Sequence, residues 1–207
     1  MRSRAVLSLL AVLAASVTVL SGCSAVQADP MGNSLRAFIR LDRADRAWAT
    51  VAGEYPEALR PRATAGPVLD ESVWTASTRA CYTDEGFIVV RRGSNFEYGS
   101  SQGQLPVQFA VAEYLCGVSV PSVPEIAAYL NASQRGALYD YYLDRVQPCL
   151  ALSGASVGSA PSRTKFDSAS GATLWSPYLA VTQAKTGSRR LAALQRACPP
   201  TPAWLHL

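Results

Sequence analysis

The sequence has none of the short patterns that hold cofactors or metal ions. Phosphate-binding glycine loops, nucleotide fingerprints and closely spaced metal ligands are missing from it. Four of its five cysteines stand more than thirty residues apart, which argues against the C-x2-C pairs of a zinc site. Basic residues are interspersed with acidic ones rather than clustered, so nucleic acid is not indicated as a partner. We therefore predict no cofactor, no bound metal and no nucleic-acid partner.

An apolar run long enough to cross a membrane is also lacking. The run from Ala5 to Leu20 has sixteen residues, whereas a transmembrane helix needs about 20. Arg2 and Arg4 precede the run, and no acidic residue stands before Cys23, which is typical of a secretory signal peptide. The sequence Leu20-Ser21-Gly22-Cys23 then resembles the lipobox read by bacterial lipoprotein-processing enzymes.

This leader predicts where the mature protein is held. We expect a signal peptide over residues 1–22, cleavage before Cys23, and acyl chains such as palmitate on that cysteine. Two or three chains on one residue make a durable anchor, so the protein is predicted to be a lipoprotein on the extracytoplasmic side of the cell membrane. All but two of the 19 Lys and Arg residues are arginine, and this composition favours a high-GC, actinobacterial host.

The remaining cysteines are predicted to form two disulfides. An even number of cysteines in an exported chain is typical of a disulfide framework, and four allow three pairings. An internal repeat, C-x4-G-x2-V, begins at Cys81 and again at Cys149, and each copy has another cysteine well after it. The repeat therefore favours Cys81 with Cys116 and Cys149 with Cys198.

The first repeat predicts a helix, a hairpin and a second helix. Asp70 is a good N-cap, and Gly86 suits the end of the helix that follows. Residues 87–90 are predicted to form a buried strand, 92–95 a turn and 96–98 a return strand. The second helix is expected to begin near Pro106 and to end at Gly117.

The second repeat predicts the same order of elements. Asn131 with Gln134 resembles a capping box, and Pro148 is expected to kink or end the helix that they begin. Gly154 is the expected stop, residues 157–165 are a candidate strand region, and a last helix is expected to open at 187–188 and to end at 199–200.

Several of these features together resemble a family of uncharacterised actinobacterial lipoproteins. The resemblance covers roughly residues 55–207 and rests on Tyr55-Pro56, Arg60-Pro61, the Cys81-x4-Gly86 helix end, the run 138–142 before Pro148-Cys149-Leu150, Trp175-Ser176-Pro177-Tyr178, and Cys198-Pro199. It implies an extracytoplasmic protein with two disulfides, and it transfers no activity and no catalytic residue.

Residues 23–54 are predicted to hold a tether and an amphipathic helix. Residues 24–34 are small and polar, as in a flexible tether. Apolar residues between Leu35 and Val51 fall on one helix face, and four arginines fall on the other: Arg36, Arg40, Arg43 and Arg46. Such a helix either lies on anionic lipid or packs on the domain, and Asp42 and Asp45, which interrupt the basic face, favour packing.

One catalytic motif offers an alternative function. Gly99-Ser100-Ser101-Gln102-Gly103 matches the G-x-S-x-G elbow of serine hydrolases, with Asp167 and His206 as possible triad partners of Ser101. An elbow needs a buried strand before it and a helix directly after it, and the polar residues 91–98 and Leu105-Pro106 do not supply them.

Two sets of aromatic residues are candidates for a binding surface. Tyr139, Tyr141 and Tyr142 either stack on a sugar of the wall or pack half-buried, and Trp175 either lines a groove or anchors the core. Packing is favoured for both.

Taken together, the sequence predicts an α+β fold of two related helix–hairpin–helix units, each with one disulfide. The predicted segments are a signal peptide (1–22), the tether and helix (23–54), and the two units (55–120 and 121–207). We expect a non-enzymatic binding protein of the cell envelope, with another envelope protein or a wall polymer as partner. A serine hydrolase using Ser101 is the alternative.

Overall fold

Helices dominate the structure, a computed structural model that describes residues 29–92, 95–100, 105–184 and 186–207. Strand is confined, within these residues, to one two-stranded hairpin, so the fold is helix-rich and mixed. In chain order the elements are α1 (Gly32–Glu54), α2 (Glu71–Asp84), β1 (Phe87–Arg92), β2 (Asn95–Ser100), α3 (Pro106–Ser119), α4 (Val123–Ala127), α5 (Ala132–Tyr141), the π-helix η1 (Tyr142–Val146), α6 (Gln147–Leu152), α7 (Arg163–Ser168), the 3-10 turn η2 (Gly171–Thr173), α8 (Tyr178–Gln183), α9 (Ser188–Ala197) and the 3-10 turn η3 (Ala203–Leu205).

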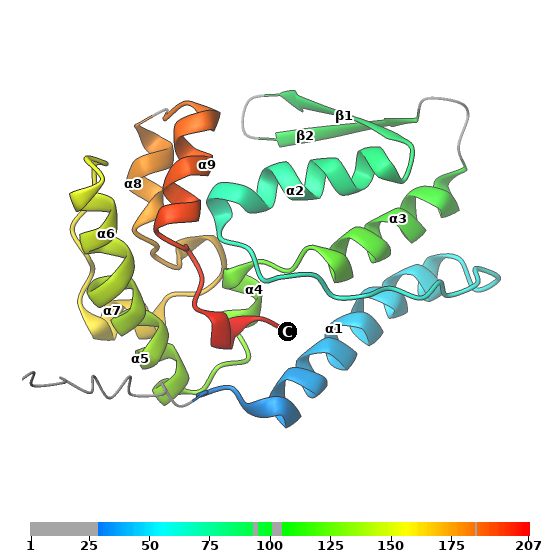
Figure 1. Cartoon of the computed structure of the whole chain (residues 1–207). Coiled ribbons are helices and arrows are strands. Elements are labelled where there is room, and N and C mark those ends of the chain that lie inside the picture. The colour runs from blue at the N-terminus through cyan, green and yellow to red at the C-terminus, as the bar shows by residue number, and fades with distance from the viewer. Residues whose placement is uncertain (1–28, 93–94, 101–104, 185) are drawn as a thin grey trace, which may run out of the picture.

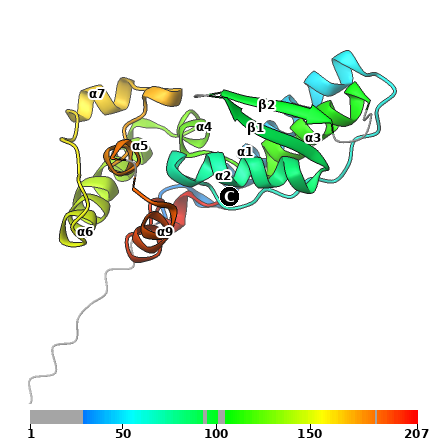
Figure 2. The ribbon, with the colours of Figure 1, turned by 90° about the horizontal axis from the view of Figure 1, so that it is seen from above.

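The elements form two groups joined through α4 (Figure 1). In one group the hairpin, the pair α2 and α3, and α1 follow one another as layers, and α1 packs along α3. The other group holds α5 to α9. It lies on the opposite side of the molecule from α3 (Figure 2). The largest cluster of buried side chains lies mostly in this second group and includes Ile39 of α1 and Met31, the residue before α1.

The first predicted helix and hairpin are confirmed. Asp70 caps α2 by accepting a hydrogen bond from the Ser72 backbone N–H at 3.0 Å, and Gly86 follows the helix at a φ of 87°. The hairpin pairs Phe87 with Ser100 at its open end. The prediction of a buried strand is wrong for one face of β1, since Ile88 and Val90 are about half exposed while alternate residues are buried. Helix α3 also continues past Gly117 to Ser119.

The helix before Cys149 does not end at Pro148. The predicted capping box of α5 is confirmed, with reciprocal hydrogen bonds of 3.0 and 2.9 Å between Asn131 and Gln134. The five residues of η1 then wind as a π-helix, and α6 continues through Pro148 to Leu152. A π-turn lets the chain pass the missing N–H of proline because the hydrogen-bond ladder is already shifted there. Gly154, at a φ of 69°, ends the helix as predicted.

The second hairpin does not form. The region 157–165 has no strand, and α7 begins at Arg163 behind its N-cap Ser162. The backbone carbonyls of this stretch are bonded to side chains: Gln147 donates to Gly158 O at 2.9 Å, and the Tyr139 hydroxyl donates to Pro161 O at 2.5 Å. The Gly158 and Pro161 carbonyls are therefore bonded to side chains and not to a neighbouring strand. Pro161 also has no N–H that could donate to a strand. The second unit therefore has an irregular segment followed by a short helix where strands were expected.

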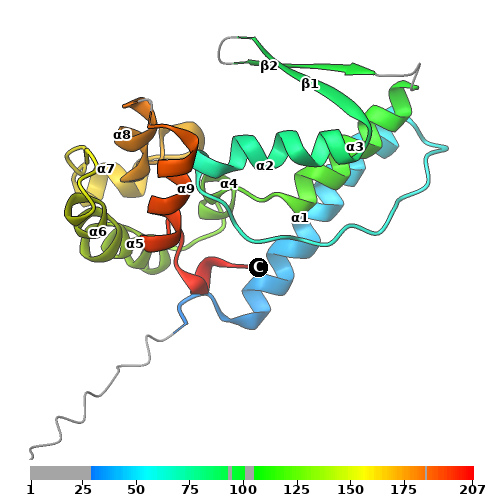
Figure 3. The ribbon, with the colours of Figure 1, turned by 45° about the horizontal axis from the view of Figure 1, so that its top comes forward.

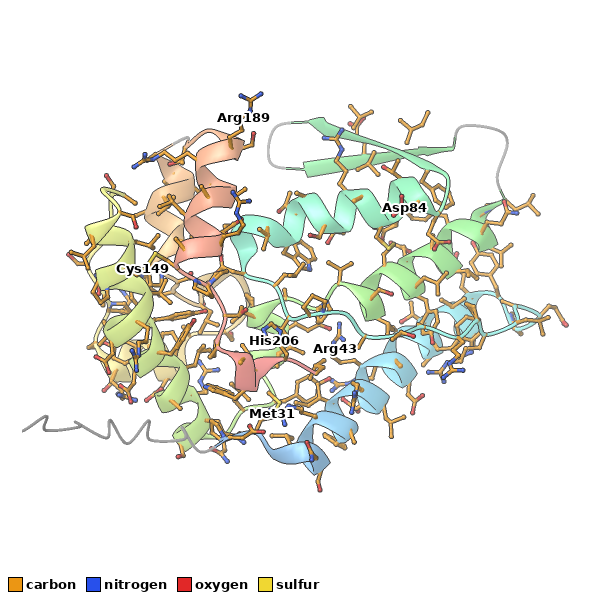
Figure 4. The ribbon with its side chains drawn as sticks, viewed as in Figure 1. Met31, Arg43, Asp84, Cys149, Arg189 and His206 are labelled. Atoms are coloured by element: carbon orange, nitrogen blue, oxygen red, sulfur yellow. A yellow bond between two sulfur atoms is a disulfide. The ribbon has the colours of Figure 1, made fainter. Side chains whose placement is uncertain are left out.

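Helix α1 packs on the domain, as its interrupted basic face indicated. Its residues join a buried cluster with α3 that centres on Val51, Tyr114 and Val118. The placement of Arg43 on the polar face is wrong: its side chain points toward α3 and α4 (Figure 4), where it bonds Glu125 at 2.7 Å and the Gly117 carbonyl at 2.6 Å. A buried guanidinium is tolerated here because carbonyls and a carboxylate satisfy its donors.

Both predicted disulfides are present. Cys81 on α2 is bonded to Cys116 on α3, and Cys149 on α6 is bonded to Cys198 at the end of α9. The first joins the two helices that carry the hairpin, and the second joins two helices of the other group. No helix of the described residues is long and apolar enough to cross a membrane.

Candidate functional site

The residues predicted to carry chemistry are not gathered at one place. Cys23, the predicted lipid attachment site, and Ser101, the nucleophile of the hydrolase alternative, lie outside the described residues. Asp167 is exposed on α7, whereas His206 lies beside α1 (Figure 4), and its carbonyl accepts a bond from Arg36 Nε at 2.8 Å. Within the described chain, no hydrogen bond joins Asp167 to His206.

A small cavity with a polar floor lies between the two groups of helices. Its volume is about 240 Å³. The first group contributes Asp70 at the start of α2, and the other residues come from α4, η1, the segment before α8, and α8 itself. The lining residues are Asp70, Val123, Pro124, Tyr142, Leu174, Trp175, Ser176 and Leu179.

Backbone pairing fixes the wall that holds Asp70. The Leu69 N–H donates to the Pro121 carbonyl at 2.8 Å, and the Val123 N–H donates to the Leu69 carbonyl at 2.9 Å. This short parallel bridge holds the residue before α2 against the start of α4. Asp70 is thereby placed at the N-terminus of α2 and at the wall of the cavity at the same time.

Ser176 connects Asp70 to the opposite wall. Its hydroxyl donates to Asp70 Oδ2 at 2.7 Å and accepts a bond from the Tyr178 backbone N–H at 3.2 Å. The other carboxylate oxygen, Oδ1, accepts from the Ser72 N–H. Asp70 is 2% exposed and Ser176 is 7% exposed, so both polar groups are buried beside the cavity.

Tyr142 brings a hydroxyl without a partner to the same cavity. It is the first residue of η1 and is fully buried, and its hydroxyl makes no hydrogen bond within the described chain. Ser176 lies near enough to oppose part of the rise in the Tyr142 pKa, but its hydroxyl already donates to Asp70 and accepts from the Tyr178 N–H, and no hydrogen bond joins it to Tyr142. A buried, unpaired hydroxyl costs free energy, about 1–3 kcal/mol, so its presence beside an open volume needs an explanation.

The cavity carries an uncompensated carboxylate. No basic residue lines it, and no ion pair of the described residues includes Asp70. Burial raises the pKa of Asp70 above its ordinary 3.8, and the hydrogen bonds from Ser72 and Ser176 partly oppose that rise. Burial also raises the pKa of Tyr142 well above its ordinary value, and the charge of Asp70 adds to this effect. Both shifts mark a site where negative charge is poorly solvated.

The rest of the wall is apolar and aromatic. Trp175 packs edge-on against the Tyr142 ring, with 5.9 Å between the ring centroids, and tilts against Tyr139 at 6.2 Å. Aliphatic side chains complete the wall. Such a combination, an apolar lining with a few convergent polar groups, is typical of small-molecule sites.

Other cavities are larger than the one at Asp70, but their polar side chains already have hydrogen-bond partners or are exposed to solvent. One of about 680 Å³ is lined by Arg43, Arg46 and Trp74, but Arg43 is bonded to Glu125, Arg46 to Asp42, and the Trp74 indole to the Val120 carbonyl. Another of about 610 Å³ lies on the side of Trp175 that faces α7, and its charged residue, Lys165, is exposed. A third, of about 270 Å³, lies beside the Cys149–Cys198 bond, and its charged residue, Arg145, is exposed. Of these four hollows, the one at Asp70 is the best candidate, because its charged group is buried and has no ion-pair partner among the described residues.

The predictions for the aromatic residues divide at this site. Tyr139 and Tyr141 pack as expected, with their hydroxyls bonded to the Pro161 and Pro199 carbonyls. Trp175 lines a cavity, which was the less favoured of its two interpretations. Asp70 was predicted only as a helix cap. Nothing local in the sequence signals its second role, because Ser176, its partner across the cavity, is 106 residues away.

Comparison with protein-family models, with curated proteins and with solved structures finds no match to this chain. In the part of the chain that the structure describes, no group of three or more His, Cys, Asp or Glu side chains is placed to hold a metal ion. The geometry of the cavity therefore carries the functional proposal.

Proposed function

We propose that this protein is a non-enzymatic binding protein of the cell envelope, anchored through lipid on Cys23, that takes a small ligand in the Asp70 cavity. The observation that carries the binding part is the Tyr142 hydroxyl, which is fully buried and unpaired beside an unneutralised carboxylate. A bound ligand would supply the missing partners. The resemblance to actinobacterial lipoproteins and the lipobox support the anchor.

The hydrogen bonds of the cavity favour binding over catalysis. Ser176 donates its proton to Asp70, and no histidine or lysine lines the cavity to act as a base for it. Asp70 and Ser176 also carry structural bonds to the starts of α2 and α8, which hold both side chains in place. Fixed polar groups of this kind suit recognition of a ligand that is not transformed.

The anchor would hold the cavity domain close to the membrane. Only five residues lie between Cys23 and Asp29, and the six extended steps that join the two residues span at most about 21 Å. Helix α1 begins just after this segment, and its outer face exposes Phe38 (56%) and Leu41 (65%). Two of the three acids on this helix are paired, Asp42 with Arg46 and Asp45 with Arg60, and the third, Glu54, is its last residue, at the end away from the anchor. This face would then lie nearest the lipid.

The anchor is tested by cell fractionation and mass spectrometry. We expect the wild-type chain in the membrane fraction, beginning at Cys23 and heavier by its acyl chains. A Cys23→Ser variant should lose the lipid, while Ser24→Ala, its neighbour, should keep it. An unmodified and uncleaved N-terminus on the membrane-bound wild-type chain would contradict the anchor.

The binding part is tested by a fragment screen read at Trp175. The chain is labelled with 5-fluorotryptophan, and the Trp175 resonance is identified by its loss in Trp175→Phe. We expect at least one class of small polar fragment to shift this resonance in a saturable way. If no amine, alcohol, amide or acid fragment shifts it, the cavity is not a ligand site.

A further inference from the structure

We infer that the Asp70 cavity selects a small primary amine in its protonated form, held by the Asp70 carboxylate and the Tyr142 hydroxyl. This inference rests on the proposed binding function and names the chemical class of its ligand. It follows from three properties of the cavity: the sign of its charge, its size, and the chemistry of its walls.

The charge of the cavity favours a cation with hydrogen-bond donors. The two oxygens of a carboxylate offer about four lone-pair sites, and the fold uses one on each oxygen, through Ser72 and Ser176. The remaining sites have no basic side chain to occupy them among the lining residues. An ammonium group has three donors and a compact positive charge, which matches two carboxylate sites and the Tyr142 oxygen.

The walls add attraction for the same group. Trp175 and Tyr142 lie edge to face beside the carboxylate, and aromatic faces attract cations through the ring quadrupole. An anionic ligand would meet Asp70 without a compensating charge. A metal ion would find one carboxylate and two hydroxyls in place of the six or more oxygens that calcium or magnesium prefers.

The size of the cavity limits the body of the ligand. A volume of about 240 Å³ is below the roughly 300–1,000 Å³ of sites for drug-sized molecules. Val123, Leu174 and Leu179 line the space that remains beyond the polar groups. A few carbon atoms fill such a space, so the expected ligand is a short aliphatic amine or a larger molecule that inserts an aminoalkyl end.

A matched pair of probes separates charge from shape. Isobutylamine and isobutanol have nearly the same size, and the amine is protonated at neutral pH. Binding of each is followed by the Trp175 fluorine resonance of the lipidated, disulfide-bonded protein in detergent. We expect the amine to bind at least about tenfold more tightly than the alcohol, which corresponds to about 1.4 kcal/mol.

Two variants test the role of the carboxylate. Asp70→Asn removes the charge but keeps a side-chain oxygen that caps α2, so the fold is retained. Asp84→Asn removes a carboxylate from the exposed end of the same helix and is the control. We expect Asp70→Asn to weaken the amine at least about tenfold and to leave the alcohol unchanged. Asp84→Asn should change neither, and thermal unfolding of each variant verifies that it is folded.

The outcomes separate the two proposals. If isobutanol binds as tightly as isobutylamine, or if Asp70→Asn retains the amine, the amine assignment is wrong while the cavity remains a ligand site. If neither probe shifts the resonance, the amine assignment is also overturned, and the fragment screen decides whether the cavity binds anything else.

Discussion

Replacing Tyr142 by phenylalanine should stabilise the ligand-free protein. The side chain is fully buried, and its hydroxyl has no hydrogen-bond partner in the described chain. Phenylalanine keeps the ring in its packing against Trp175 and removes the unpaired group. Leaving a buried hydroxyl unpaired costs about 1–3 kcal/mol, so the free energy of unfolding of Tyr142→Phe should rise by up to that amount.

The matched control is Tyr178→Phe. Tyr178 is also fully buried, but its hydroxyl donates to the Cys198 carbonyl at 2.7 Å. Its removal leaves that carbonyl without this donor, and the free energy of unfolding should fall by about 1 kcal/mol. Two tyrosine-to-phenylalanine changes in one core are thus expected to have opposite signs.

Thermal unfolding with both disulfides intact measures the two effects. For a chain of this size each kcal/mol shifts the Tm by about 2–4 °C. We expect a higher Tm for Tyr142→Phe and a lower one for Tyr178→Phe. If Tyr142→Phe lowers the Tm as Tyr178→Phe does, the Tyr142 hydroxyl has a partner in the free protein, such as an ordered water, and the reasoning about an unsatisfied site is wrong.

Further predictions concern the disulfides, the buried carboxylate and the hydrolase motif. Removing the Cys149–Cys198 bond opens a loop of 49 residues and should cost about 4 kcal/mol by chain entropy, measured by urea unfolding of the double serine variant; an unchanged midpoint would contradict this. Because burial raises the pKa of Asp70, the folded chain keeps a proton that the unfolded chain loses above the ordinary 3.8. The free energy of unfolding should therefore fall as pH rises from 3.8 to the raised pKa, and the advantage of Asp70→Asn over wild type should grow across that window; a constant difference would refute the shift. A fluorophosphonate probe should not label the folded protein, and labelling that disappears in Ser101→Ala would revive the hydrolase alternative.

Local signals explain why the first unit was predicted well. Asp70 and Gly86 act on the backbone within a few residues of themselves, as a cap and as a left-handed helix end. The pairing of Cys81 with Cys116 could also be predicted, because these cysteines lie in the last turns of two helices that flank one hairpin. The pairing of Cys149 with Cys198 is correct although the hairpin expected between them does not form. These features depend on short stretches of chain.

The second unit shows where such signals are insufficient. The shared pattern C-x4-G-x2-V ends at Val157, and the residues after it form no strand; side chains of Gln147 and Tyr139 bind carbonyls of this segment. The helix also continues through Pro148, because a π-helix precedes it, and no pattern of residues in the sequence predicts that π-helix. Tertiary bonds determine the structure at both places.

The candidate site was not predictable from the sequence for the same reason. Asp70 looks like a helix cap, and Tyr142 looks like core packing, and both are correct descriptions of part of their environment. The cavity exists only where four separate segments meet. The proposed function depends on two features of the folded chain within the described residues: the buried Tyr142 hydroxyl has no hydrogen-bond partner, and the buried Asp70 carboxylate has no positive charge beside it. Neither feature can be recognised from the sequence.

A crystal structure of the protein soaked with isobutylamine would show whether the amine binds between Asp70 and Tyr142. We predict density for the amine in the cavity, with its nitrogen within hydrogen-bond distance of both the Asp70 carboxylate and the Tyr142 hydroxyl. A cavity that holds only ordered water at the same soak concentration, with that water bonded to Tyr142, would contradict the account.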